Sequence, residues 1–88
     1  MKEYTISFYR TSDAQHMSVQ FRAQQLTKQA VENALKKNRK AINTWLLFGE
    51  TDMIVSNVST GEVVAKGRYE YNAFASCGGY EFQILEML

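Results

Sequence analysis

The chain of 88 residues is long enough for one domain with one hydrophobic core. Hydrophobic residues make up 45% and charged residues 22% of it, a composition typical of globular rather than disordered proteins. The net charge of +1 excludes both a strongly acidic surface that imitates DNA and a uniformly basic surface that binds nucleic acid. Any electrostatic function must therefore be local.

Two segments near the start alternate apolar and polar residues with the period of a β-strand. Their apolar sides are formed by Tyr4, Ile6 and Phe8 and by Met17, Val19 and Phe21. The polar connection TSDAQ between them predicts a hairpin with one apolar face.

The next segment, QLTKQAVENALKKNRK, carries an apolar stripe at helical spacing and predicts a helix over residues 28–39. Thr27 is the expected N-cap. Val31 and Leu35 lie on the stripe, so we expect both to be buried against the sheet.

Further strands are expected after the helix. The short apolar run NTWLLF predicts a central strand over residues 44–48, with Trp45 in the core. The following GETD predicts a turn that contains Glu50 and Asp52. MIVSNV and EVVAKGRYEY flank STG and predict a hairpin, and YEFQILEM forms the last strand after the loop NAFASCGG.

The predicted order is β-β-α-β-β-β in a single α+β domain over residues 1–88. We expect a twisted, mainly antiparallel sheet with one helix packed on one face. Because a single helix covers only part of such a sheet, the other face depends on polar residues, a homodimer contact or a partner.

The single cysteine, Cys77, cannot form an internal disulfide, which favours a reducing compartment and predicts a cytoplasmic protein. The opening MKEYTISFYR lacks the apolar core of a signal peptide, and no apolar run approaches the ~20 residues that span a bilayer. We therefore expect a soluble protein without membrane contact.

Residues for catalysis are few. His16 and Cys77 lie in separate connections, which disfavours a catalytic Cys-His pair, and Glu50 and Asp52 have an ordinary role in a turn rather than as metal ligands. Neither a P-loop nor a GxGxxG pattern is present. We therefore expect no catalytic residue, no cofactor and no metal site.

A cluster of cations occupies LKKNRK, residues 35–40. Its members are Lys36, Lys37, Arg39 and Lys40. One interpretation is structural, because cations in a last helical turn are favoured by the helix dipole and extend easily into water. The other is a site for a polyanion or an acidic partner, which Lys66 and Arg68 would extend if their strand end lies beside the helix terminus.

Tyrosines give a second indication of binding. Tyr69 and Tyr71 lie on one side of their strand, where they either anchor an interface, stack on bases, or pack on the sheet. The candidate partner-binding residues are therefore Lys36, Lys37, Arg39, Lys40, Lys66, Arg68, Tyr69 and Tyr71.

The short chain, the passage VQFRAQQLTKQAVENALKK from strand to helix and the terminal strand GGYEFQILEML resemble small anti-CRISPR proteins of phages and mobile elements, particularly inhibitors of type I surveillance complexes. The resemblance implies a non-enzymatic protein in the host cytoplasm that occupies a protein or ribonucleoprotein complex. Such inhibitors cover the nucleic-acid channel or block nuclease recruitment. KKNRK matches the inhibitors with a basic patch, whereas the balanced charge departs from the acidic DNA mimics.

Three functions follow, in this order. The first is a protein-binding inhibitor or adaptor that uses the basic helix end and exposed aromatic residues, with weak or no direct binding of nucleic acid. The alternative is a small nucleic-acid-binding module, in which the same cations contact phosphates and Tyr69 or Tyr71 stacks on bases. A small enzyme or enzyme subunit comes last.

Overall fold

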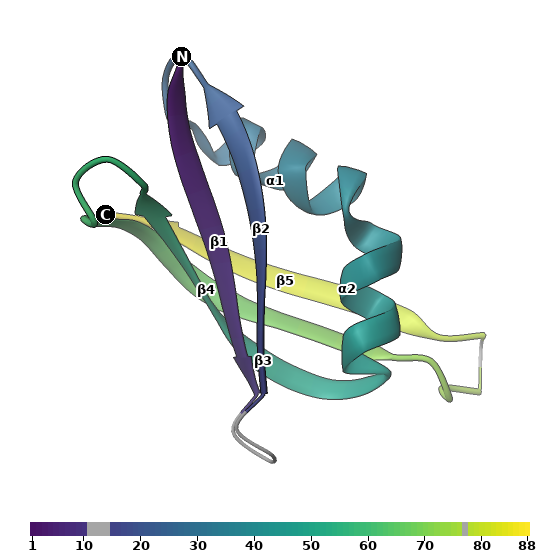
Figure 1. Ribbon diagram of the computed structural model, residues 1–88. Coiled ribbons are helices and arrows are strands. Elements are labelled where there is room, and N and C mark those ends of the chain that lie inside the picture. The colour runs from purple at the N-terminus through teal and green to yellow at the C-terminus, as the bar shows by residue number, and fades with distance from the viewer. Residues whose placement is uncertain (11–14, 77) are drawn as a thin grey trace.

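The structure is a computed structural model that describes residues 1–10, 15–76 and 78–88. One five-stranded sheet and two helices make up this part of the chain (Figure 1). In chain order the elements are β1 (Lys2–Arg10), β2 (Gln15–Ala23), α1 (Lys28–Lys37), α2 (Arg39–Leu46), β3 (Phe48–Asn57), β4 (Val63–Asn72) and β5 (Tyr80–Met87). The predicted α+β class with an antiparallel sheet is confirmed.

The strands lie in the order β2-β1-β3-β4-β5, and each neighbouring pair is antiparallel. The hairpins β1–β2, β3–β4 and β4–β5 join strands that are adjacent along the chain, whereas the helices connect β2 to β3 across β1. The edges of the sheet are therefore β2 and β5.

The prediction of one helix over residues 28–39 is wrong at its end, because α1 stops at Lys37 and a second helix begins at Arg39. Asn38 separates them with φ −105° and ψ 12°, and its side-chain amide donates to the carbonyl of Ala34 at 2.8 Å. The start is confirmed, since Thr27 Oγ1 accepts from the backbone N–H of Ala30 at 3.1 Å.

The strand predicted over residues 44–48 is also wrong, because Thr44 to Leu46 form the end of α2. Ile42, Trp45 and Leu46 are spaced by three and four residues, and this helical spacing outweighs the strand-like run WLLF. Leu47 ends the helix with φ 59° and ψ −62°, and β3 then begins at Phe48. β3 therefore contains Glu50 and Asp52, which the sequence had placed in a turn.

Both helices pack on the same face of the sheet, which we call the covered face. The helices contribute Val31, Leu35, Ile42 and Leu46 to the core, and the predicted burial of Val31 and Leu35 is confirmed. The strands contribute Tyr4, Ile6, Phe8, Val19, Met53, Val55, Ala65 and Tyr69. Trp45 packs against this core while remaining half-buried, with the Arg10 guanidinium 4.8 Å from its ring centroid.

Gly67 allows β4 and β5 to approach closely. A Cβ atom at this position would lie 1.9 Å from the carbonyl oxygen of Ile84. Because that neighbour is backbone, no side-chain rotation could relieve the overlap. A glycine at this position is therefore required by the pairing of the two strands.

Candidate partner-binding surfaces

The four cations of KKNRK lie at the junction between the two helices. Lys36 and Lys37 belong to the last turn of α1, and Arg39 and Lys40 to the first turn of α2. All four are exposed and border one hollow of about 510 Å³, which we call the basic hollow. Its other lining residues are Asn43, Thr44, Leu47, Tyr71 and Ala73.

The break at Asn38 changes the electrostatic explanation of the cluster. Lys36 and Lys37 lie at the negative end of α1, where the helix dipole favours cations. Arg39 and Lys40 lie at the positive end of α2, where the dipole disfavours them, and the first turn of α2 has no acidic residue. The helix dipole therefore accounts for only half of the cluster.

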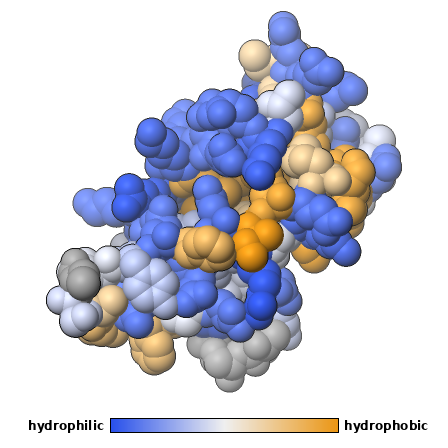
Figure 2. Space-filling view, turned by 180° about the vertical axis from the view of Figure 1, so that it is seen from behind, coloured by the Kyte–Doolittle hydropathy of each residue, from blue (hydrophilic) through white to orange (hydrophobic). Residues whose placement is uncertain are grey.

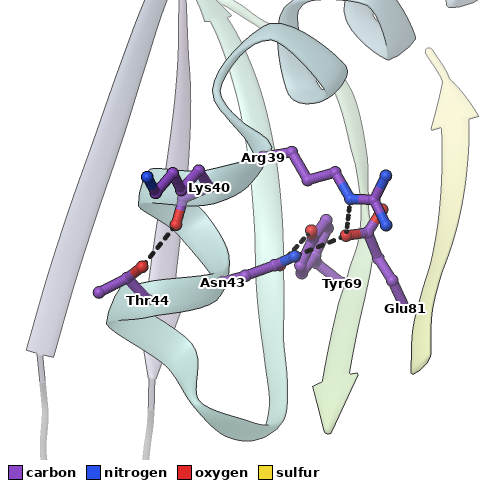
Figure 3. A network of polar contacts seen from close by, with 6 residues as sticks. All are labelled: Arg39, Lys40, Asn43, Thr44, Tyr69 and Glu81. Atoms are coloured by element: carbon purple, nitrogen blue, oxygen red, sulfur yellow. Dashed lines mark hydrogen bonds and ion pairs between the residues drawn. The ribbon is translucent and has the colours of Figure 1, made fainter. Parts of the chain in front are cut away.

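Arg39 has a structural partner across the fold. Its Nε donates to Glu81 Oε2 on β5 at 2.9 Å, and the same oxygen accepts from the side-chain amide of Asn43 at 2.7 Å (Figure 3). The Tyr69 hydroxyl donates to Asn43 Oδ1 at 2.6 Å. This network links α2 to β4 and β5, so Arg39 has a role in holding the helix on the sheet.

Tyr69 belongs to the core rather than to an exposed surface. It is 1% exposed and lies edge-on to the Phe8 ring, with 5.9 Å between the centroids. Burial of the phenol and, next, the neighbouring Glu81 carboxylate raise the pKa of Tyr69 far above its ordinary value. The expectation that it is exposed for binding is wrong, whereas its neighbour Tyr71 is half-buried at the basic hollow.

The three lysines of the cluster differ from Arg39. Within the described part of the chain, no carboxylate lies within ion-pair distance of Lys36, Lys37 or Lys40. Lys40 extends from α2 on the side opposite to Glu81 (Figure 3). The basic hollow therefore carries positive charge that the described fold does not neutralise.

Lys66 and Arg68 lie on the other side of the sheet. Because side chains alternate along a strand and Ala65 and Tyr69 point into the core, Lys66 and Arg68 point away from the helices. Arg68 contacts Glu50 on this side, with Nη2 2.6 Å from Oε1. The predicted extension of the helix-end cluster by these two residues is therefore wrong.

We call this second side of the sheet the open face, because neither helix covers it. Ile54, Ile84 and Phe82 are 43%, 53% and 56% exposed there. A shallow hollow of about 390 Å³ lies between Ile54, Ile84 and the stems of Lys66 and Arg68. Viewed from behind, the molecule shows apolar side chains gathered between hydrophilic ones (Figure 2).

Of the residues considered for catalysis in the sequence, the structure describes His16, Glu50 and Asp52. The exposed ring of His16 lies against Tyr9, with 4.7 Å between the centroids, and Cys77 lies outside the described residues. Glu50 and Asp52 both border Arg68 on the open face. In the described ranges, no three His, Cys, Asp or Glu residues form a group suited to a metal ion.

The helices of the described residues are all too short or too polar to cross a membrane. Comparison with known proteins found no matching family model, no similar curated protein and no similar solved structure. Inferences about function therefore depend on the chemistry of the surfaces described above.

Sequence reasoning missed the contacts that hold α2 in place. Asn43 and Glu81 are 38 positions apart, and neither belongs to a motif. A polar residue directly after the buried Ile42 was the one available signal, since a polar side chain at the edge of a core needs a partner. That signal indicates a contact without identifying it.

Proposed function

We propose that this chain is a non-enzymatic inhibitor or adaptor that binds an acidic surface of a protein or ribonucleoprotein complex through the basic hollow. The observation that carries the proposal is the presence of Lys36, Lys37 and Lys40 around one hollow, without a carboxylate partner in the described structure. Charges of one sign around a concavity attract a partner of the opposite sign and orient its approach.

Two features of the hollow support a protein contact. Tyr71 and Leu47 add aromatic and apolar surface beside the cations, and a mixture of aromatic and cationic residues is typical of interface centres. Arg39, held by Glu81, fixes the start of α2, so that the backbone carrying Lys40 is ordered before a partner binds.

The specific partner that we propose is a type I CRISPR surveillance complex, which would make the chain an anti-CRISPR protein. The basic hollow would then cover an acidic surface that the complex needs for DNA binding or for nuclease recruitment. The short α+β chain and its local basic cluster support this proposal by resemblance to such inhibitors.

The test is binding to purified type I surveillance complexes, together with their binding of target DNA and recruitment of nuclease. A variant with Lys36→Ala, Lys37→Ala and Lys40→Ala should bind at least tenfold more weakly than the wild type. A matched variant with Lys2→Ala, Lys28→Ala and Lys66→Ala removes the same charge from other exposed positions and should bind nearly normally. Equal affinities of the wild type and the first variant would overturn the role of the basic hollow.

The salt dependence of wild-type binding gives a second measure. Affinity should fall between low and physiological ionic strength, because exposed charges are screened by added salt. The fall should be smaller for the variant without the three lysines of the hollow. If no type I complex binds the chain, the anti-CRISPR proposal fails, whereas the hollow can still be tested against other acidic proteins.

A nucleic-acid-binding module remains the second candidate, because Tyr71 lies in the same hollow as the lysines. Phosphates would contact the cations, and a base would stack on the exposed part of the Tyr71 ring. Titration with bare single-stranded and duplex DNA and RNA separates the two candidates. Tight binding that weakens in both the lysine variant and Tyr71→Ala would favour this module over the inhibitor.

A further inference from the structure

The last strand, β5, is an edge strand with little protection against pairing. It neighbours only β4 in the described sheet, and its sequence YEFQILEM contains neither Pro nor Lys, two residues that commonly block edges. Tyr80, Phe82 and Ile84 are all exposed on its open-face side. Such a strand favours the addition of another strand.

The backbone groups that β5 offers can be identified from its pairing with β4. The N–H of Leu88 donates to the carbonyl of Val64 at 3.0 Å, so the backbone groups of Leu88 are directed toward β4. In an antiparallel pair the direction alternates from residue to residue. The outward-directed backbone groups therefore belong to Glu81, Gln83, Leu85 and Met87.

We infer that β5 pairs antiparallel with β5 of a second copy of this chain, about a two-fold axis at Gln83, which joins the two sheets edge to edge. With the axis there, Gln83 faces its counterpart and Glu81 faces Leu85 of the second copy. All of these residues direct their backbone groups outward, so they form the hydrogen-bonded pairs of the new ladder.

The side chains fit the same register. On the open face, Phe82 lies opposite Ile84 of the second copy, and the symmetry repeats this pair of aromatic and β-branched residues. Tyr80 lies opposite Glu86, so no carboxylate faces another. Moving the axis by one residue to Ile84 would set Phe82 opposite Glu86, which leaves the apolar pair unmade.

Charge also favours a second copy over a strand of another protein. The segment from Phe82 to Leu85 is uncharged, and the Glu81 carboxylate beside it is already paired with Arg39. A self-pairing strand needs this arrangement, because the two-fold axis would bring an uncompensated charge beside Gln83 close to the same charge of the second copy. The proposal is independent of the partner of the basic hollow.

The mass in solution is the first test, by light scattering or sedimentation of the whole chain over a range of concentrations. We expect a dimer of twice the 10.1 kDa chain mass that dissociates on dilution. Gln83→Pro should shift the equilibrium to the monomer, because the substitution removes an outward-directed backbone N–H without removing a hydrogen bond to β4. A monomer at all concentrations up to ~1 mM would overturn the proposal.

A second pair of variants keeps the test decisive if Gln83→Pro does not fold. Ile84→Lys should weaken the dimer at least tenfold, because it removes the apolar pair with Phe82 and brings the two lysines of the dimer close together across the axis. Ile54→Lys is the matched control, since Ile54 is exposed to a similar extent on β3, away from the edge. Equal dimer affinities of these two variants would place the contact elsewhere and refute the pairing of β5.

The register has its own test. In the background Cys77→Ser, Gln83→Cys should form a disulfide-linked dimer on mild oxidation, because residues facing each other in a hydrogen-bonded pair have Cα atoms about 5.5 Å apart. Gln20→Cys on the opposite edge strand β2 is the control and should stay unlinked. Equal or faster linking of the control would contradict an axis at Gln83.

Discussion

The two faces of the sheet share the same alternation of residues but differ in what covers them. On the covered face, Phe8, Met53 and Val55 are fully buried beneath α1 and α2, whereas Ile54 and Ile84 on the open face keep 43% and 53% of their surface exposed. Burial accounts for the apolar residues of the covered face, because removal from water stabilises the fold. The apolar residues of the open face gain less from folding, and the proposed pairing of β5 with a second copy would cover Ile84.

The largest difference between the faces should appear when side chains are shortened. Leu35→Ala on the covered face should lower the free energy of unfolding by about 3 kcal/mol, because it removes a side chain only 3% exposed and leaves a cavity. Ile84→Ala on the open face should cost less than about 1 kcal/mol at a concentration where the chain is monomeric. Urea denaturation measures both, and equal losses would contradict the distinction between the faces.

The covered face was largely predictable from sequence. Alternation in β1 and β2 identified Tyr4, Ile6 and Phe8 as core residues, and the helical stripe identified Val31 and Leu35. These signals are periodic and local, so they can be recognised in the sequence without knowing which elements pack against each segment. The same alternation set Tyr69 and Tyr71 on one side of β4 but could not reveal that the helices cover that side.

The candidate sites depended on information that the sequence does not contain locally. The apolar run WLLF fits a strand and a helix equally well, and missing α2 also hid that Arg39 and Lys40 begin a helix. Lys66 and Arg68 were grouped with the helix end on the basis of charge alone. Their separation by the sheet follows from tertiary packing, which decides the face on which each residue lies.

Tyr69 tests whether a polar network helps to hold the covered face together. Tyr69→Phe should lower the free energy of unfolding by about 1 to 2 kcal/mol at neutral pH, because Asn43 Oδ1 loses a donor inside the fold. Chemical denaturation measures the loss. Tyr80→Phe is the control, since the Tyr80 hydroxyl donates to Glu70 on the open face and should contribute less. A larger loss of stability in Tyr80→Phe than in Tyr69→Phe would contradict the role of the Tyr69 network in holding the covered face together.

The same residue predicts a pH dependence. Because folding raises the pKa of Tyr69 above its ordinary value of 10.0, the stability linked to the neutral phenol is fully present below pH 10 and is lost as the pH rises further. The wild type should therefore lose up to about 1.4 kcal/mol per pH unit above pH 10 through this group. Tyr69→Phe should show a shallower alkaline slope, and an unchanged slope would exclude Tyr69 as its source.

A smaller change in stability is expected from backbone strain at the end of α2. Leu47 has a backbone conformation with positive φ that costs a non-glycine residue of order 1 kcal/mol or more. Leu47→Gly should relieve this strain and stabilise the fold by about 0.5 to 1 kcal/mol, after the greater flexibility of the unfolded chain is counted. Leu88→Gly, at another exposed leucine, is the control and should not stabilise. Thermal and urea denaturation would have to agree, and a loss of stability in Leu47→Gly would refute the interpretation.

The smallest expected effects concern the interaction of two lysines with the helix dipoles, which is favourable at Lys36 and unfavourable at Lys40. Lys36→Glu sets a negative charge at the negative end of α1 and should cost about 0.5 kcal/mol, whereas Lys40→Glu sets it at the positive end of α2 and should gain about as much. Lys66→Glu, at no helix end, is the control for the change in net charge. Both differences should shrink in 1 M salt, because screening weakens interactions with the dipole.

If residues 28–40 formed one continuous helix, both substitutions would destabilise, so a loss at Lys40 would contradict the break at Asn38. A gain in stability at Lys40 together with weaker binding of an acidic partner would mean that the lysine is kept for binding at a cost to the fold.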